Sequence, residues 1–288
     1  HFARDMCDFS AVPCGFLRRA PQPTEQRVKI DLGHITLNVQ EDGDASGAPV
    51  VFSNSLGTSL ELWDKVIPLL PQNLRLIRYD MRGHGASDVP PAPYSMGMLI
   101  RDAEALLDHL EIRDCVFVGL SVGGMIAQGL ATKRLDQIRA MVLSNSAAKM
   151  GNPPMWKGRM DAVKAGGIES LADDITTRWF SRAFLKTPEL DYWRDMLTGT
   201  PEQGYLGACA AIAGTDFYTT TAALTLPSLV IAGSEDGASP PDLIRETAEL
   251  IKGSRFELIR RAGHLPCVEQ PNVFAALLTE FLSDIGHT

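Results

Sequence analysis

Residues 115–124 read CVFVGLSVGG and join an apolar run to a turn rich in glycine. The run at residues 115–118 is typical of a parallel strand that is buried on both faces of a sheet. Apolar residues then recur at helical spacing, at Met125, Ile126, Leu130 and Ala131. The stretch therefore predicts a buried strand, a tight turn and a helix, with Ser121 at the tip of the turn.

The turn itself, Gly119-Leu120-Ser121-Val122-Gly123, has the Gly-x-Ser-x-Gly pattern of a nucleophile elbow. Such a turn strains the serine backbone, and small residues two positions away on either side avoid collisions. It holds the hydroxyl at the carboxyl end of the sheet, above the N-terminus of a helix. A buried serine in a glycine-rich turn is the alternative, but the flanking strand and helix favour a catalytic nucleophile.

A serine hydroxyl needs a base, and His264 is the histidine best placed to supply it. It lies in a loop just past the last predicted strand, at residues 256–259. His1 and His287 lie at the ends of the chain, and His34 lies in an early predicted hairpin. The sequence therefore predicts that His264 accepts the proton of Ser121.

The imidazole in turn needs an acid that orients it, and Asp236 is the candidate. It follows the apolar strand predicted at residues 229–232, and a carboxylate there can hold the correct tautomer of His264. Glu235 is the local competitor, but Asp236 lies further beyond the end of its strand. The resulting order along the chain, serine then acid then histidine, is the one that accompanies a nucleophile elbow.

Hydrolysis of an ester also needs donors for the oxyanion. One predicted donor is the backbone amide of Val122, directly after the nucleophile. The other is the amide of Leu56, in the loop at residues 53–57 that follows a short apolar strand. Gly57 lets that backbone bend close to the site.

Strand and helix patterns alternate over most of the chain, which predicts an α/β protein with a mostly parallel, doubly wound sheet. A hairpin at residues 28–39 precedes the alternation, and residues 148–222 interrupt it with helical patterns alone. The predicted organisation is a loose N-terminal extension at residues 1–27, a core at residues 28–147 and 223–288, and a helical cap at residues 148–222. The cap patterns lie at residues 155–165, 171–184, 190–197 and 203–212.

Composition narrows the class of protein. The chain has 288 residues, a formal net charge of -8 and no long basic run, which argues against binding to nucleic acid. It has no apolar stretch of about 20 residues, so we expect no membrane span. The five cysteines are odd in number and widely spaced, which favours reduced thiols and a cytoplasmic location, although Cys7 and Cys14 are close enough to pair.

Several segments together resemble the α/β-hydrolase superfamily over about residues 28–285. They are the elbow at Ser121, the segment around Asp236, the pair Gly263-His264, and Asp80-Met81-Arg82-Gly83-His84-Gly85-Ala86-Ser87. In that family the Arg-Gly-His-Gly stretch is mainly a structural loop. The resemblance therefore implies the α/β-hydrolase fold and a structural role for His84.

Finer features resemble one branch, the 3-oxoadipate enol-lactonases. The loop Ser53-Asn54-Ser55-Leu56-Gly57-Thr58, with Trp63-Asp64 after it, replaces the His-Gly start usual in the superfamily. Asn145-Ser146-Ala147-Ala148 and Arg178-Trp179-Phe180 also look like that branch. The resemblance implies hydrolysis of a small enol-lactone to 3-oxoadipate through an acyl-enzyme, with no metal or organic cofactor.

An anionic lactone or ester also carries a free carboxylate, and we expect the cap to supply a cation or donor to it. The candidates are Lys149, Lys157, Arg159 and Arg178, with Trp156 and Trp179 as walls. For any one of them a solvated surface cation or a core aromatic is the alternative.

Two other functions fit the same motifs. A general carboxylesterase or perhydrolase would use the same three residues, because specificity depends on the cap. A ligand receptor built on a hydrolase scaffold is the second alternative. The sequence leaves the oligomeric state open.

Overall fold

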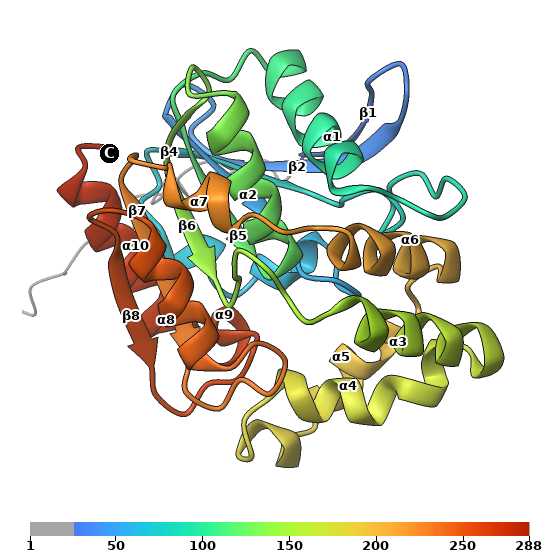
Figure 1. Ribbon diagram of the computed structural model, residues 1–288. Helices are drawn as coiled ribbons and strands as arrows, with labels where there is room; N and C mark the ends of the chain where they lie inside the picture. Colours follow the sequence, from blue (N-terminus) through green and yellow to red (C-terminus); the bar gives the residue numbers. More distant parts are fainter. Residues whose placement is uncertain (1–25, 288) are drawn as a thin grey trace, which may run out of the picture.

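The predicted apolar runs form the strands of one eight-stranded sheet (Figure 1). The computed structural model describes residues 26–287, so most of the predicted extension, with Cys7 and Cys14, lies outside the described residues. In chain order the strands are β1 (Gln26–Asp31), β2 (Thr36–Gly43), β3 (Ala48–Ser53), β4 (Leu74–Tyr79), β5 (Cys115–Leu120), β6 (Ile138–Ser144), β7 (Ser228–Gly233) and β8 (Arg255–Ile259). The first strand begins two residues before the predicted hairpin.

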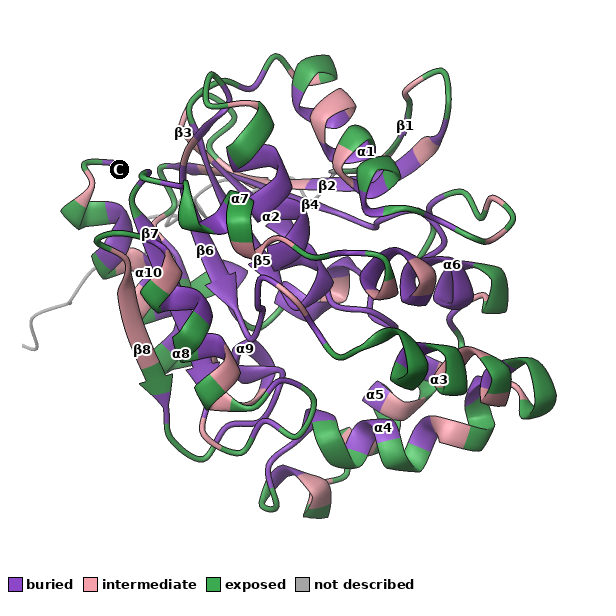
Figure 2. Cartoon of the chain, in the orientation of Figure 1, coloured by how far each residue is buried: buried purple, intermediate pink, exposed green. Residues whose placement is uncertain are grey.

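The sheet order is β1-β2-β4-β3-β5-β6-β7-β8. Strand β2 pairs antiparallel with β1 and β4, and every pair from β4 through β8 is parallel. All residues of β5 and β7 are buried (Figure 2), which explains why their sequences are almost continuously apolar. The prediction of a mostly parallel, doubly wound sheet is confirmed.

Helices cover this sheet on both faces. The longer ones in the core are α1 (Met96–His109), α2 (Val122–Lys133), α8 (Pro241–Leu250) and α10 (Pro271–Asp284). Shorter ones, which the sequence patterns did not predict, are η1 (Leu60–Trp63), η2 (Ile67–Leu69) and α9 (Pro266–Glu269). The ring centroid of Trp63, on η1, lies 5.0 Å from that of Phe52 on β3 and 5.9 Å from that of Phe274 on α10. The helices η1 and α10 therefore pack on the same face of β3.

A helical insertion separates β6 from β7, and its helices other than the last gather on one side of the core (Figure 1). The last, α7, packs against α2 and α8 of the core instead. Its elements are α3 (Pro153–Gly166), η3 (Ile168–Leu171), α4 (Ala172–Trp179), η4 (Phe184–Lys186), α5 (Glu189–Thr198), α6 (Glu202–Ala213) and α7 (Tyr218–Ala222). The prediction of one helix over residues 171–184 is wrong, because the chain leaves the helix at Phe180 (φ −119°, ψ 150°). The residues after Trp179 instead bond to loops of the core.

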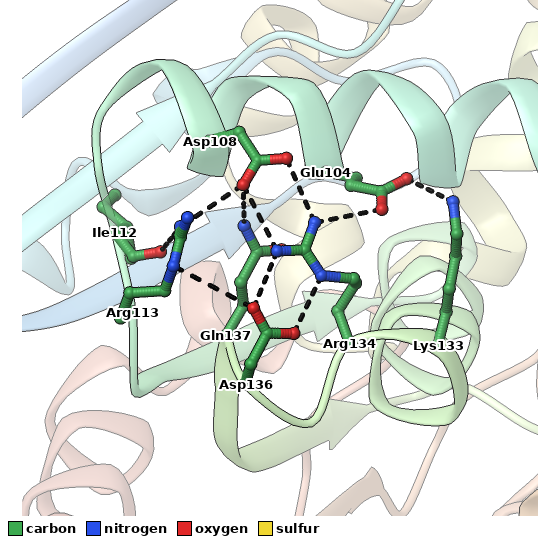
Figure 3. A network of polar contacts seen from close by, with 8 residues as sticks. All are labelled: Glu104, Asp108, Ile112, Arg113, Lys133, Arg134, Asp136 and Gln137. Atoms are coloured by element: carbon green, nitrogen blue, oxygen red, sulfur yellow. Dashed lines mark hydrogen bonds and ion pairs between the residues drawn. The ribbon is translucent and has the colours of Figure 1, made fainter.

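A network of charges joins the C-terminal ends of α1 and α2, as Figure 3 shows. Arg134 donates hydrogen bonds to Glu104 (3.0 Å), Asp108 (3.0 Å) and Asp136 (2.8 Å). Lys133 also pairs with Glu104. One guanidinium therefore ties together two helices and the turn that leads into β6. Within residues 26–287, no helix is long and apolar enough to cross a membrane.

Candidate active site

Ser121 lies between β5 and α2 with a backbone conformation that L-residues rarely adopt (φ 57°, ψ −117°). Its amide donates to the carbonyl of Ser144 at 2.9 Å, and its own carbonyl accepts from the hydroxyl of Ser146 at 2.7 Å. These bonds to β6 and the residues after it hold the strained turn in place.

Two glycines make this turn possible. A Cβ on Gly119 would lie 2.2 Å from the carbonyl oxygen of Gly123, and one on Gly123 would lie 2.3 Å from that of Ser53. Backbone atoms cannot yield to such contacts, so only glycine fits at either position. The turn thus has the strain and the small flanking residues that the elbow pattern predicts.

His264 and Asp236 form a buried hydrogen-bonded pair. Nδ1 of His264 lies 2.8 Å from Oδ2 of Asp236, and both side chains are almost fully buried. The other carboxylate oxygen, Oδ1, accepts from the amides of Ala238 (2.7 Å) and Ser239 (2.8 Å). Since Nδ1 faces the carboxylate, Nε2 is the ring nitrogen that remains to act as the base.

Asn145 is a third partner of this pair, and the sequence did not identify its role. Its Nδ2 donates to Oδ2 of Asp236 at 2.7 Å and to the carbonyl of Gly263 at 3.3 Å. The residue directly follows β6 and has a positive φ of 49°. A polar residue at the carboxyl end of a central strand was the available signal, because such residues gather at one edge of a parallel sheet.

A strip of the cap, residues 178–182, is bonded to the loops that carry the acid and the base. The carbonyl of Trp179 accepts from the amide of His264 at 2.7 Å, and that of Arg178 accepts from Gly237 at 3.1 Å. Arg182 donates its amide to Glu235 at 3.0 Å. We call these residues the cap strip; its backbone is hydrogen-bonded to both the acid loop and the base loop.

Glu269, on α9, joins the same structure from the other side. Its carboxylate accepts from the amide of Gly263 at 2.6 Å and from the amide of Ser181 at 3.1 Å. Burial raises the pKa of Glu269, although these hydrogen bonds oppose the increase. One carboxylate therefore connects the loop of His264 to the cap strip.

The loop at residues 53–57 is fixed by side chains of the core. Asn54 donates to the carbonyl of Tyr79 at 2.9 Å and accepts from the indole of Trp63 at 2.8 Å. The amides of Leu56 and Val122 find no acceptor within residues 26–287. Both remain available to a ligand, as donors to an oxyanion must be.

A small cavity, of about 80 Å³, lies between the core and the cap. Core residues that line it include Ser55, Leu56, Ser121, Ser239 and His264. Cap residues that line it include Met155, Trp156, Arg159, Arg178, Trp179 and Tyr205. The predicted nucleophile, base and oxyanion loop thus share one cavity, together with four of the six cap residues predicted to contact substrate, namely Trp156, Arg159, Arg178 and Trp179.

The prediction for Lys149 needs correction. Its ammonium group pairs with Asp216 at 2.9 Å on the exposed surface, and the residue does not line the cavity. Lys157 is likewise exposed and pairs with Asp161. Both cations point to solvent because the apolar face of the cap is turned toward the core, which leaves long charged side chains outside.

His84 is fully buried and does not line the cavity. Its Nδ1 lies 3.2 Å from the carbonyl of Arg82, and burial lowers its pKa to about 4. A neutral, buried imidazole of this kind fits the structural role that its motif implies.

The family model described as "alpha/beta hydrolase fold" matches residues 48–271. The chain belongs to the α/β-hydrolase family. It is 36% identical to 3-oxoadipate enol-lactonase 2 of Acinetobacter baylyi over 243 residues, which cover 83% of this chain and 90% of that protein. The predicted resemblance to enol-lactonases is confirmed.

Two solved structures of other α/β-hydrolases resemble this one. The enol-lactonase of Burkholderia xenovorans LB400 superposes with a TM-score of 0.85 at 33% identity, over 89% of this chain and 100% of that one. A thermophilic esterase of Thermogutta terrifontis, in a malate-bound structure, gives a TM-score of 0.84 at 30% identity, over 91% of this chain and 100% of that one. This α/β-hydrolase is thus related to both enol-lactonases and esterases.

Proposed function

We propose that this α/β-hydrolase cleaves the ester bond of a small anionic lactone, and that its substrate is 3-oxoadipate enol-lactone. The observation that carries the proposal is the cavity itself. Ser121 and His264 line it together, and Nδ1 of His264 is bonded to the buried carboxylate of Asp236. That arrangement supplies a nucleophile, a base and an orienting acid in one place.

In the proposed mechanism Nε2 of His264 takes the proton of Ser121 as the hydroxyl oxygen attacks the lactone carbonyl. The amides of Leu56 and Val122 stabilise the tetrahedral oxyanion. The ring C–O bond then breaks, and the leaving enolate takes the proton from His264 and becomes the ketone. Water, deprotonated by His264, hydrolyses the acyl-enzyme and frees the hydroxyl of Ser121. No metal or organic cofactor takes part.

Two further observations support this substrate. The cavity is small, which suits a compact lactone better than a long acyl chain. The relatives that share most of the chain include enol-lactonases from two bacteria, and the related Thermogutta esterase binds malate, a small dicarboxylate.

Substitution of the nucleophile tests the proposal. We expect Ser121→Ala to lower kcat/KM for the enol-lactone by at least about 10³-fold, because the covalent step is lost. The matched control is Ser283→Ala, which removes an exposed hydroxyl on α10 and should leave the rate unchanged. Full turnover by the Ser121→Ala protein would refute the mechanism.

The same purified enzyme decides between the alternatives. Rapid turnover of simple aryl esters together with no lactone hydrolysis would favour a general carboxylesterase. A receptor would show negligible turnover of any ester, and its ligand affinity would survive Ser121→Ala.

A further inference from the structure

Tyr205, on α6, has a hydroxyl without a hydrogen-bond partner in the described part of the chain. The residue is only 1% exposed and lines the cavity. A buried hydroxyl that is left unsatisfied destabilises the folded protein, so its partner is expected to arrive with a ligand. Burial also raises the pKa of Tyr205, so the phenol stays protonated and can donate.

Arg159, on α3, lines the same cavity and pairs with no carboxylate of residues 26–287. Its guanidinium lies over the ring of Trp156, 4.9 Å from the centroid, which orients the charged group. Burial raises the pKa of Tyr205 and of Cys209, and the Arg159 guanidinium opposes the increase in both. Both residues line the cavity, so one ligand can meet the cation and the unsatisfied phenol together.

Two other polar side chains of the cap already have partners. Arg178 is paired with Asp174 at 3.0 Å and its side chain is 44% exposed. The indole N–H of Trp156 donates to the carbonyl of Met150 at 2.7 Å. Arg159 and Tyr205 are thus two cap side chains that line the cavity and have no hydrogen-bond partner among residues 26–287.

Tyr205 also lies beside the proposed oxyanion loop. A Cβ on Gly57 would be 3.4 Å from Cε2 of Tyr205, so the tyrosine ring packs against the turn that directly follows Leu56. A short substrate whose reacting carbonyl lies at Leu56 can therefore place a second group at Tyr205.

We propose that Arg159 and Tyr205 form an anion subsite that binds the free carboxylate of the substrate. The planar guanidinium and the phenol together offer a fork of donors that matches two carboxylate oxygens. The proposal rests on the proposed function in one respect, that the cavity at Ser121 takes the ester. It assigns substrate selection to α3 and α6 and not to Arg178 or Lys149.

Paired substrates test the subsite. Monomethyl glutarate carries a free carboxylate and dimethyl glutarate does not, while both offer the same methyl ester. We expect the ratio of their kcat/KM values to fall by about 10- to 100-fold in Arg159→Met, which is the range for a hydrogen bond to a charged group. Arg159→Lys should recover part of the ratio, and Tyr205→Phe should lower it about 3- to 10-fold.

Lys157→Met, on the same helix, is the matched control and should leave the ratio unchanged, because Lys157 points away from the cavity. A ratio that stays constant in Arg159→Met would overturn the subsite, and so would an equal fall in Lys157→Met. The thermal unfolding of each variant is measured alongside, and the ratio is read only from enzyme that remains folded.

Binding separates this proposal from the proposed function. In a Ser121→Ala background, calorimetry should detect adipate but not dimethyl adipate, and Arg159→Met should abolish the adipate signal. Adipate binding that depends on Arg159 supports the subsite even if the enzyme never hydrolyses the enol-lactone. If the enzyme hydrolyses the enol-lactone but Arg159→Met binds adipate as tightly as the parent protein, the subsite proposal is refuted. The proposed function would then still hold.

Discussion

Asn145 illustrates how a single side chain can organise the site. It donates to the oxygen of Asp236 that also faces His264, and to the carbonyl of Gly263 next to that histidine. It therefore fixes the acid relative to the loop of the base. Its positive φ allows this geometry and restricts the residues that can replace it.

We predict that Asn145→Gly and Asn145→Ala each lower kcat about 10-fold, because both remove the amide that orients Asp236. The alanine variant should in addition be about 1 kcal/mol less stable than the glycine variant, because glycine tolerates a positive φ and alanine does not. Steady-state kinetics and thermal unfolding measure the two effects separately. Wild-type kcat in the glycine variant would show that the amide has no orienting role.

The contrast between Asn145 and Ser121 shows what a local pattern can reveal. Ser121, Asp236 and His264 each follow a recognisable strand, so their positions could be predicted from neighbouring residues. The partner of Asn145 lies 91 positions along the chain, and no local pattern encodes that contact. Lys149 was misassigned for the same reason, since only the packed cap determines whether a cation faces the cavity or solvent.

Among the elements, the cap strip differs most from expectation. The residues from Leu171 to Phe184 have a helical pattern, yet the helix ends at Trp179. The carbonyls of Arg178 and Trp179 bond to core loops, which are distant in sequence. Those tertiary hydrogen bonds outweigh the weak local preference for helix.

Glu269 holds the strip and the base loop together, so we predict that Glu269→Gln lowers kcat about 10-fold with KM changed less than about 2-fold. The carboxylate accepts hydrogen bonds from the amides of Gly263 and Ser181. A glutamine would turn an NH₂ group toward one of these donors, and the lost hydrogen bond would loosen the loop of His264. Steady-state kinetics on a neutral ester gives both constants. Glu280→Gln, which alters a surface pair with Arg255, is the control; an unchanged kcat in Glu269→Gln would refute the positioning role.

At the scale of the whole molecule, the fold could be predicted well because its sheet is parallel and buried. Such strands are short apolar runs separated by helical patterns, and each is recognisable alone. The short helices η1, η2 and α9 could not be predicted in this way. Each is too short to show a period, and packing such as that of Trp63 between Phe52 and Phe274 stabilises it.

The charge network of Figure 3 contributes stability that depends on pH and salt. Hydrogen bonds from Arg134 lower the pKa of Asp136 to about 2 and also lower that of Asp108. As the pH falls below the ordinary aspartate value of about 4, the unfolded chain binds protons before the folded protein does. The contribution of this network to the free energy of unfolding is therefore complete near neutral pH and is lost as the pH falls from about 4 to about 2.

We predict that Arg134→Met lowers Tm by about 2–3 °C at pH 7 and low salt, because partly exposed ion pairs stabilise modestly. The difference from wild type should shrink in 1 M salt and below about pH 4. Calorimetric melts at several pH values measure this difference in Tm. The control is Arg260→Met, because Arg260 is exposed and forms no ion pair in the described chain. A pH-independent difference would contradict the electrostatic origin.

The bonds of the cap strip also bear on protein engineering. A designer who wishes to change specificity would naturally transplant the complete insertion from a relative as a module. In this molecule such a chimaera would import foreign residues at 178–182, where the carbonyl of Trp179 accepts from His264 and Ser181 donates to Glu269. Grafts restricted to α3 and α6 would alter the walls of the cavity and keep that support intact.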